Sequence, residues 1–195
     1  MDHLIIWQIF TNLEEVALSR KDIMLILQGN FPQHLFGRLR QLEVWHDDSA
    51  AGFLVGLLEI LCSLENLVLS CNSYEEIFSN EGCLEKHVDV RKFARIKSLR
   101  LVELNHLIKY LLKQDSQLNS IFQYLEFLSL YHCRNLLSLL PLSSSISFGN
   151  LTHLVVYNCG KLVSLVTCSV AKSLERLVML SISGCSAANW GTLIC

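Results

Sequence analysis

The stretch LEFLSLYHC, residues Leu125–Cys133, recurs twice at equal spacing along the chain. The second copy is LTHLVVYNC (Leu151–Cys159) and the third is LVMLSISGC (Leu177–Cys185). The copies share the pattern L-x-x-L-x-[LVI]-x-x-C, whose positions we number 1 to 9. Alternation over positions 3–7 directs the aliphatic side chains to one face of a strand and the x residues to the other. Each copy therefore predicts one short strand of a repeating unit.

Looser versions of this phrase begin upstream at Leu13, Leu39, Leu64 and Ile96. The intervals between successive starts lie in or just beyond the range of roughly 20–29 residues that is usual for a leucine-rich repeat. We expect an α/β leucine-rich-repeat solenoid of about seven repeats. A curved parallel sheet would form its concave face, and short helices, 3₁₀ turns and loops its convex face. The stretch Phe53–Leu61 favours one such helical turn.

The predicted strands lie near residues 13–19, 39–45, 64–70, 96–102, 125–131, 151–157 and 177–183. No Pro/Gly/Ser-rich linker divides them, so residues 1–195 are predicted to form a single leucine-rich-repeat domain.

The composition requires extensive burial, because 39 of the 195 residues are leucine and 51% are apolar. The longest apolar stretches, Phe53–Leu69 and Leu101–Leu112, are interrupted by charged residues such as Glu59 and Glu103. A spanning helix needs about 20 predominantly apolar residues, so we expect no membrane association. The first ten residues lack a basic n-region and an A-x-A-like cleavage site. A secretory signal is therefore not indicated, and a cytoplasmic location is expected.

The net charge of −2 does not favour nucleic-acid binding. A basic cluster of Arg91, Lys92, Arg95 and Lys97 is interpreted as the solvated outer side of one repeat.

Eight cysteines are present, and no two of them have the C-x₂₋₄-C spacing of a zinc pair. Position 9 is Asn72, Cys133, Cys159 and Cys185 in four repeats, where the chain turns away from the strand. An Asn there can bind loop amides, and a Cys can fill buried space with a weak donor. We interpret these four residues as structural turn residues.

The x residues at positions 3, 5 and 7 face away from the core and form three columns across the sheet. Position 3 is occupied by Glu15, Gln41, Asn66, Ser98, Phe127, His153 and Met179. Position 5 is occupied by Ala17, Glu43, Val68, Arg100, Ser129, Val155 and Ser181. Position 7 is occupied by Ser19, Trp45, Ser70, Val102, Tyr131, Tyr157 and Ser183.

An aromatic patch is predicted where Phe127, Tyr131, His153 and Tyr157 meet on adjacent strands. Tyr and Trp are favoured at protein-binding hot spots because they combine a large rigid surface with a polar group. The alternative is that aromatic residues simply suit strands. The candidate partner-binding residues on this face are Trp45, Arg100, Phe127, Tyr131, His153 and Tyr157.

Catalytic motifs are missing from the sequence, which has no G-x-S-x-G, no H-E-x-x-H and no G-x-x-x-x-G-K-[ST] phosphate loop. The polar run His46-Asp47-Asp48 follows a predicted strand and is interpreted as a solvated turn. We expect no enzyme activity, no cofactor and no metal.

Longer strings within the repeats carry a family resemblance. They are C-x-x-L at Cys133–Leu136, SSSISFGNLTHL at Ser143–Leu154, AKSLERLVMLSISGC at Ala171–Cys185 and SYEEIF at Ser73–Phe78. With them the chain resembles the leucine-rich-repeat region of plant coiled-coil nucleotide-binding leucine-rich-repeat (NBS-LRR) disease resistance proteins. The G-x-I-P turn of extracellular plant repeats is missing, in agreement with an intracellular site.

This resemblance implies a protein-binding module of a plant intracellular immune receptor. Its partner would be a pathogen effector, a guarded host protein or the nucleotide-binding domain that the repeats hold inactive. The 195 residues contain neither the coiled-coil nor the nucleotide-binding domain, and the final SAANWGTLIC leaves the repeat pattern. The alternative is therefore a truncated receptor fragment with a regulatory or decoy role, or with no autonomous function.

Overall fold

The computed structural model describes residues 12–19, 21–23, 25, 36–45, 53–70, 94–107, 122–140 and 146–185. The interpretations of Asn72, His46-Asp47-Asp48, Arg91, Lys92 and Ser73–Phe78 fall outside these residues.

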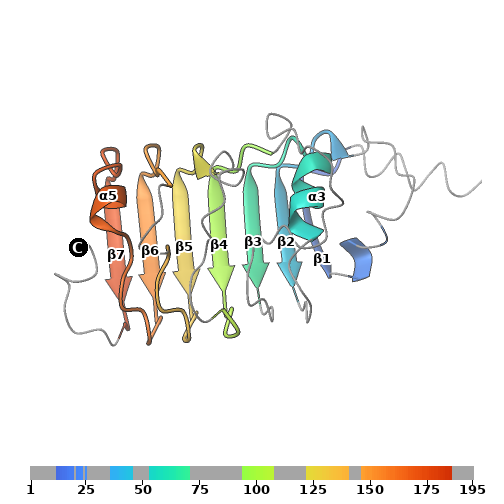
Figure 1. Cartoon of the computed structure of the whole chain (residues 1–195). Helices are drawn as coiled ribbons and strands as arrows, with labels where there is room; N and C mark the ends of the chain where they lie inside the picture. Colours follow the sequence, from blue (N-terminus) through green and yellow to red (C-terminus); the bar gives the residue numbers. More distant parts are fainter. Residues whose placement is uncertain are drawn as a thin grey trace, which may run out of the picture.

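The described residues form one parallel sheet in which strands β1 to β7 follow one another in chain order (Figure 1). The strands are β1 (Glu15–Ser19), β2 (Gln41–Trp45), β3 (Asn66–Ser70), β4 (Ser98–Val102), β5 (Phe127–Tyr131), β6 (His153–Tyr157) and β7 (Met179–Ser183). Each lies within the range predicted for it, and neighbouring strands pair position by position. The predicted fold class, a leucine-rich-repeat solenoid, is confirmed.

Backbone hydrogen bonds join the repeats before the strands begin. The carbonyl at position 2 accepts hydrogen bonds from the amides at positions 2 and 3 of the next repeat. The carbonyl of Lys97, for example, accepts from the amides of Glu126 at 2.8 Å and Phe127 at 2.9 Å. The same pair of bonds recurs from β1 to β7. Because every repeat starts with the same contact, these short strands keep a common register.

The core lies behind the sheet and runs along the repeat axis. Leucines at positions 1, 4 and 6 of the fifth repeat, Leu125, Leu128 and Leu130, are at most 1% exposed. On the return path, Leu136 and Leu162 are completely buried. Each repeat covers the aliphatic residues of its neighbour, so the stack buries one continuous core that no single repeat could form.

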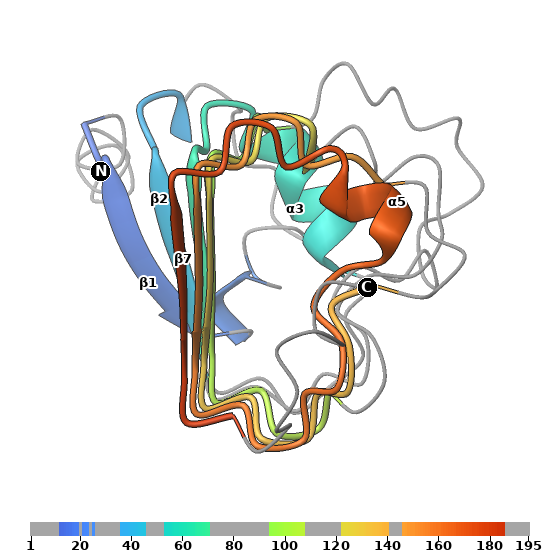
Figure 2. The same ribbon diagram turned by 90° about the vertical axis from the view of Figure 1, so that its left-hand side faces the viewer.

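Two helices lie on the side of the solenoid opposite the sheet (Figure 2). Helix α3 (Phe53–Ile60) falls where a helical turn was expected and buries Leu57 and Leu58. Helix α5 (Cys168–Ala171) was not predicted, because it is a single turn and too short to show helical periodicity. The hydroxyl of Thr167 accepts a hydrogen bond from the Val170 amide at 3.3 Å and caps this turn.

Seen end on, strands β3 to β7 nearly superpose, whereas β2 and β1 turn progressively away from them (Figure 2). At the other end, β7 is the last described strand, and its core-facing Leu180 is 40% exposed. The aliphatic residues of the described strands are therefore most completely buried from β2 to β6. None of the helices formed by the described residues has the length and apolarity needed to cross a lipid bilayer.

Candidate protein-binding surface

The exposed face of the sheet carries the three predicted columns. Position 3 of β5, Phe127, lies directly beside position 3 of β6, His153, and Tyr131 lies beside Tyr157 in the same pairing. In both strands the intervening aliphatic residues are buried and the column residues are open to solvent. The register therefore places the four residues of the predicted aromatic patch on two adjacent strands.

The rings of this patch contact one another in pairs. Phe127 and His153 stack, with ring centroids 4.6 Å apart and planes 21° from parallel. Tyr131 and Tyr157 are tilted by 46°, with centroids 6.3 Å apart. Phe127 and Tyr157 remain 41% and 45% exposed. Large aromatic surface is thus held in place and left open to solvent.

Hydrogen bonds fix the ring of His153 on Phe127. The Thr152 hydroxyl donates to the Glu126 carbonyl at 2.9 Å, and Thr152 Oγ1 lies 2.8 Å from His153 Nδ1. Because the hydroxyl proton is used on Glu126, Oγ1 is left to accept a hydrogen bond from Nδ1. The Glu126 carbonyl of the neighbouring repeat therefore orients the stacked pair through Thr152.

His132 belongs to the same surface, although sequence analysis did not include it. Its ring meets the Tyr157 ring edge-on, with centroids 5.3 Å apart and planes at 84°. Asn158 Nδ2 lies 2.8 Å from His132 Nδ1. We call Phe127, Tyr131, His132, His153 and Tyr157 the aromatic cluster.

His132 was missed because strand alternation ends at position 8. There the backbone turns through the left-handed region in the last four repeats. The φ values are 56° at Glu103, 57° at His132, 54° at Asn158 and 67° at Gly184. Asn and Gly are the residues that adopt this conformation most readily, so Asn158 and Gly184, each directly before a position-9 Cys, were the available sequence signal.

This turn also forms hydrogen bonds to the end of the neighbouring strand. The amide of His132 donates to the Tyr157 carbonyl at 2.9 Å, and the amide of Glu103 donates to the Tyr131 carbonyl at 2.8 Å. Each position-8 amide therefore anchors the position-7 residue of the next repeat. For β5 and β6 those anchored residues are the two tyrosines of the aromatic cluster.

The position-9 cysteines lie on the core side of this turn and contact its backbone carbonyls. The thiols of Cys133 and Cys159 are fully buried, and each lies 3.6 Å from the carbonyl two positions earlier, at Tyr131 and Tyr157. The neighbouring Cys133 thiol and burial raise the pKa of Cys159 above its ordinary value. Cys185 makes the same contact with Ser183 at 3.7 Å but is only partly buried, because it belongs to the last described repeat. As weak donors, the thiols of Cys133 and Cys159 support the turns that bear Tyr131 and Tyr157.

The two remaining candidate residues lie apart from the cluster. Trp45 is 40% exposed at position 7 of β2, and strands β3 and β4 separate it from Tyr131. Arg100 is exposed at position 5 of β4, directly beside Ser129 of β5. Arg100 therefore borders the aromatic cluster, whereas Trp45 does not.

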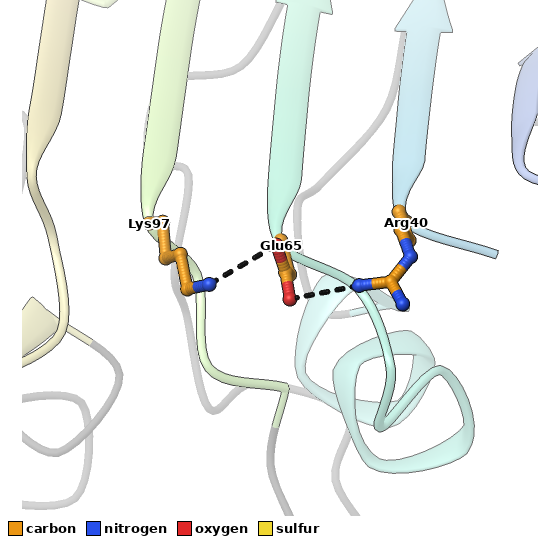
Figure 3. Close-up of polar contacts among 3 residues, drawn as sticks. All are labelled: Arg40, Glu65 and Lys97. Atoms are coloured by element: carbon orange, nitrogen blue, oxygen red, sulfur yellow. Dashed lines mark hydrogen bonds and ion pairs between the residues drawn. The ribbon is translucent and has the colours of Figure 1, made fainter. Parts of the chain in front are cut away.

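Charged residues gather along the side of the sheet where β2, β3 and β4 begin. This feature was not predicted. The Glu65 carboxylate lies 3.1 Å from the Arg40 guanidinium and 3.2 Å from the Lys97 ammonium (Figure 3). The guanidinium of Arg95 lies 5.2 Å from the centre of the Tyr124 ring. Arg95 and Lys97 thus border the sheet rather than the outer side of the repeat, where the basic cluster was expected. They become neighbours of Tyr124 and Glu65 only once the repeats are stacked.

Among the described residues, no three His, Cys, Asp or Glu side chains come together in a way that would hold a metal ion. The chemistry of the exposed sheet is that of stacked rings with polar groups at their edges. Such a surface is suited to protein contact.

Comparison with known proteins agrees with this description. A family model for the leucine-rich repeats of RPS2-like plant disease resistance proteins matches residues 12–146 and 143–186. The chain belongs to this family. Its repeats form a protein-binding module of the disease-resistance leucine-rich-repeat type.

Similarity to other known proteins is weak. A solved structure, the leucine-rich repeat domain of the type III effector XopL, is 15% identical, and the match covers 93% of this chain and 73% of that one with a TM-score of 0.33. A similarity this low supports no argument about function. No curated protein matches the chain.

Proposed function

We propose that this module binds a protein partner through the aromatic cluster, as the sensing region of a cytoplasmic plant immune receptor. The partner would be a pathogen effector, a guarded host protein or the nucleotide-binding domain that the repeats hold inactive. Support for the receptor assignment comes from the family match, which extends over residues 12–186.

The observation that carries the proposal is that the aromatic cluster is both exposed and already ordered. Stacking fixes Phe127 against His153 at 4.6 Å, and edge contact fixes His132 against Tyr157 at 5.3 Å. An ordered surface loses little side-chain freedom when a partner binds. Aromatic side chains also contribute disproportionately to binding energy at interfaces. The cluster therefore has the properties of an interface centre.

The experiment is a quantitative pull-down from plant leaf extract with the purified chain. The test variant Tyr131→Ala/Tyr157→Ala removes two rings from adjacent strands of the sheet. The control variant Leu137→Ala/Val163→Ala removes two exposed apolar side chains, 39% and 57% exposed, from adjacent repeats on the return path. Both variants should fold, because none of the four side chains belongs to the core.

The proposal expects a set of proteins retained by the wild-type chain and the control but depleted with the tyrosine variant. Equal retention by the tyrosine variant and the wild type would contradict it. Depletion by the control alone would place the binding surface on the return path instead.

A further inference from the structure

Charge is distributed unevenly along the solenoid. The described residues of the β4–β7 half contain seven cationic side chains, Arg95, Lys97, Arg100, Arg134, Lys161, Lys172 and Arg176. The same residues contain three carboxylates, Glu103, Glu126 and Glu175. In the described residues from 12 to 70 the sign reverses, with six carboxylates and three cations. The aromatic cluster therefore lies in the positively charged half of a chain whose net charge is −2.

Three of these cations are exposed near the cluster and form no ion pair with any described residue: Arg100, Arg134 and Lys161. The Arg134 amide donates to the His132 carbonyl at 2.9 Å, and the Lys161 amide donates to the Arg134 carbonyl at 3.2 Å. Backbone hydrogen bonds therefore connect both residues to the turn that bears His132. Arg100 lies one strand away on the sheet face.

Three other cations of this half contact neighbouring side chains. Lys97 pairs with Glu65 at 3.2 Å, and Arg95 lies over the Tyr124 ring. Arg176 donates to the side-chain oxygen of Asn150 at 2.9 Å. Two carboxylates also lie near the cluster: Glu103, whose backbone amide donates a hydrogen bond to the Tyr131 carbonyl, and Glu126, which directly precedes Phe127. Around the cluster, positive charge therefore exceeds negative charge.

We propose that the aromatic cluster, together with Arg100, Arg134 and Lys161, binds an acidic segment of its partner protein that carries aromatic or aliphatic side chains between its carboxylates. The inference rests on the proposed function and names the chemistry of the partner. The rings supply apolar contact area, and the cations attract and align the carboxylates. Charge complementarity of this kind raises the association rate and selects against partners of the wrong sign. The attraction weakens as salt screens exposed charges.

The test measures binding of three fluorescein-labelled peptides to the purified chain by fluorescence anisotropy. The peptides have equal length and repeat Glu-Trp-Glu-Leu, Gln-Trp-Gln-Leu or Lys-Trp-Lys-Leu. We expect the Glu peptide to bind about tenfold more tightly than the Gln peptide at low salt. The advantage should shrink at physiological ionic strength, and the Lys peptide should bind most weakly.

A matched pair of variants locates the site. Arg134→Glu/Lys161→Glu should abolish the advantage of the Glu peptide. Lys21→Glu/Lys172→Glu has the same net charge, changes two exposed cations away from the cluster, and should preserve that advantage. Loss of the advantage in both variants, or in neither, would overturn the inference.

The peptides also separate this inference from the proposed function. If all three bind equally well and all lose affinity in Tyr131→Ala/Tyr157→Ala, the aromatic cluster binds protein but does not select acidic segments. That result would overturn the inference and leave the proposed function standing. If the Glu peptide fails to bind and the chain elutes from a sizing column as a salt-sensitive dimer, a second copy occupies the surface and the inference is also wrong.

Discussion

Gly184 lies against the backbone of Asn158 at the same turn position of the adjacent repeat. A Cβ added to Gly184 would be 3.2 Å from Asn158 Cα and 3.3 Å from Asn158 N. The φ of Gly184 is also positive, at 67°. Close approach and left-handed backbone therefore both favour glycine at this position.

Gly184→Ala should lower the free energy of unfolding by at least about 1–2 kcal/mol, the usual cost of a side chain in the left-handed region. The matched control is Gly149→Ala, because a Cβ there would meet Ser147 Oγ and the Ser173 carbonyl at ordinary distances of 3.6 and 4.0 Å. That control should be neutral or slightly stabilising, since alanine restricts the unfolded chain. Urea denaturation of both variants measures the difference, and equal stability would contradict the assigned turn geometry.

The Glu65 side chain joins three repeats through Arg40 and Lys97, and its removal tests this edge of the sheet. All three side chains are partly solvated, with exposures of 61% for Arg40, 31% for Glu65 and 45% for Lys97. Exposed ion pairs contribute about 0–1 kcal/mol each. Glu65→Gln should therefore reduce stability by about 1 kcal/mol at low salt and much less in about 1 M salt. Urea denaturation at the two salt concentrations measures both values.

The control for this prediction is Glu59→Gln, which neutralises an exposed carboxylate on α3. If the loss of stability in Glu65→Gln persists unchanged in high salt, packing rather than charge explains the effect.

Much of this architecture follows from the sequence because one repeated phrase contains both the strand and its register. Once Cys133, Cys159 and Cys185 were aligned, the partners of Phe127 and Tyr131 on the next strand could be named. Residues beyond the regular alternation have no such register to place them. His132 was missed because its backbone is left-handed, and a histidine does not by itself indicate that conformation.

The ion pairs of Glu65 were missed for a different reason. Arg40, Glu65 and Lys97 all occupy position 2 of three successive repeats, whereas columns were predicted only for positions 3, 5 and 7. Helix α5 was missed because its cap, Thr167, precedes only a single helical turn.

The buried thiol of Cys159 should make stability depend on alkaline pH. The hydrogen bond with the Cys133 thiol and burial raise its pKa in the folded state, while the same hydrogen bond lowers the pKa of Cys133. The folded pair therefore still holds one proton at a pH, above about 8.5, where both thiols of the unfolded chain are ionised. The free energy of unfolding should be independent of this group below that pH. It should fall by up to about 1.4 kcal/mol per pH unit above it.

Cys159→Ala should flatten this alkaline slope, whereas Cys168→Ala, which removes an exposed thiol on α5, should not. Urea titrations between neutral and alkaline pH provide the measurement. A slope that is identical in the wild type and Cys159→Ala would be incompatible with a buried neutral thiol.

Leu154 tests the core behind the aromatic cluster. It is 2% exposed, and Leu154→Asp would bury an unpaired charge, whose cost exceeds the stability of most domains. We expect no cooperative unfolding transition by circular dichroism. Val155→Asp places the same charge at the next position, on the exposed face, and should fold.

A milder substitution keeps this test informative if the Asp variant cannot be purified. Leu154→Ala should cost about 2–5 kcal/mol, as for other buried leucines. Wild-type stability in Leu154→Ala would be inconsistent with the continuous core.

Site-specific photo-crosslinking tests most directly whether the partner contacts the exposed sheet face. A benzophenone amino acid at Ser129 lies between Phe127 and Tyr131 on that face, and one at Val163 lies on the return path, at a residue that is 57% exposed. After irradiation in leaf extract, we expect a protein partner to be captured from position 129 and not from position 163. Capture of the same partner from position 163 alone would contradict this expectation.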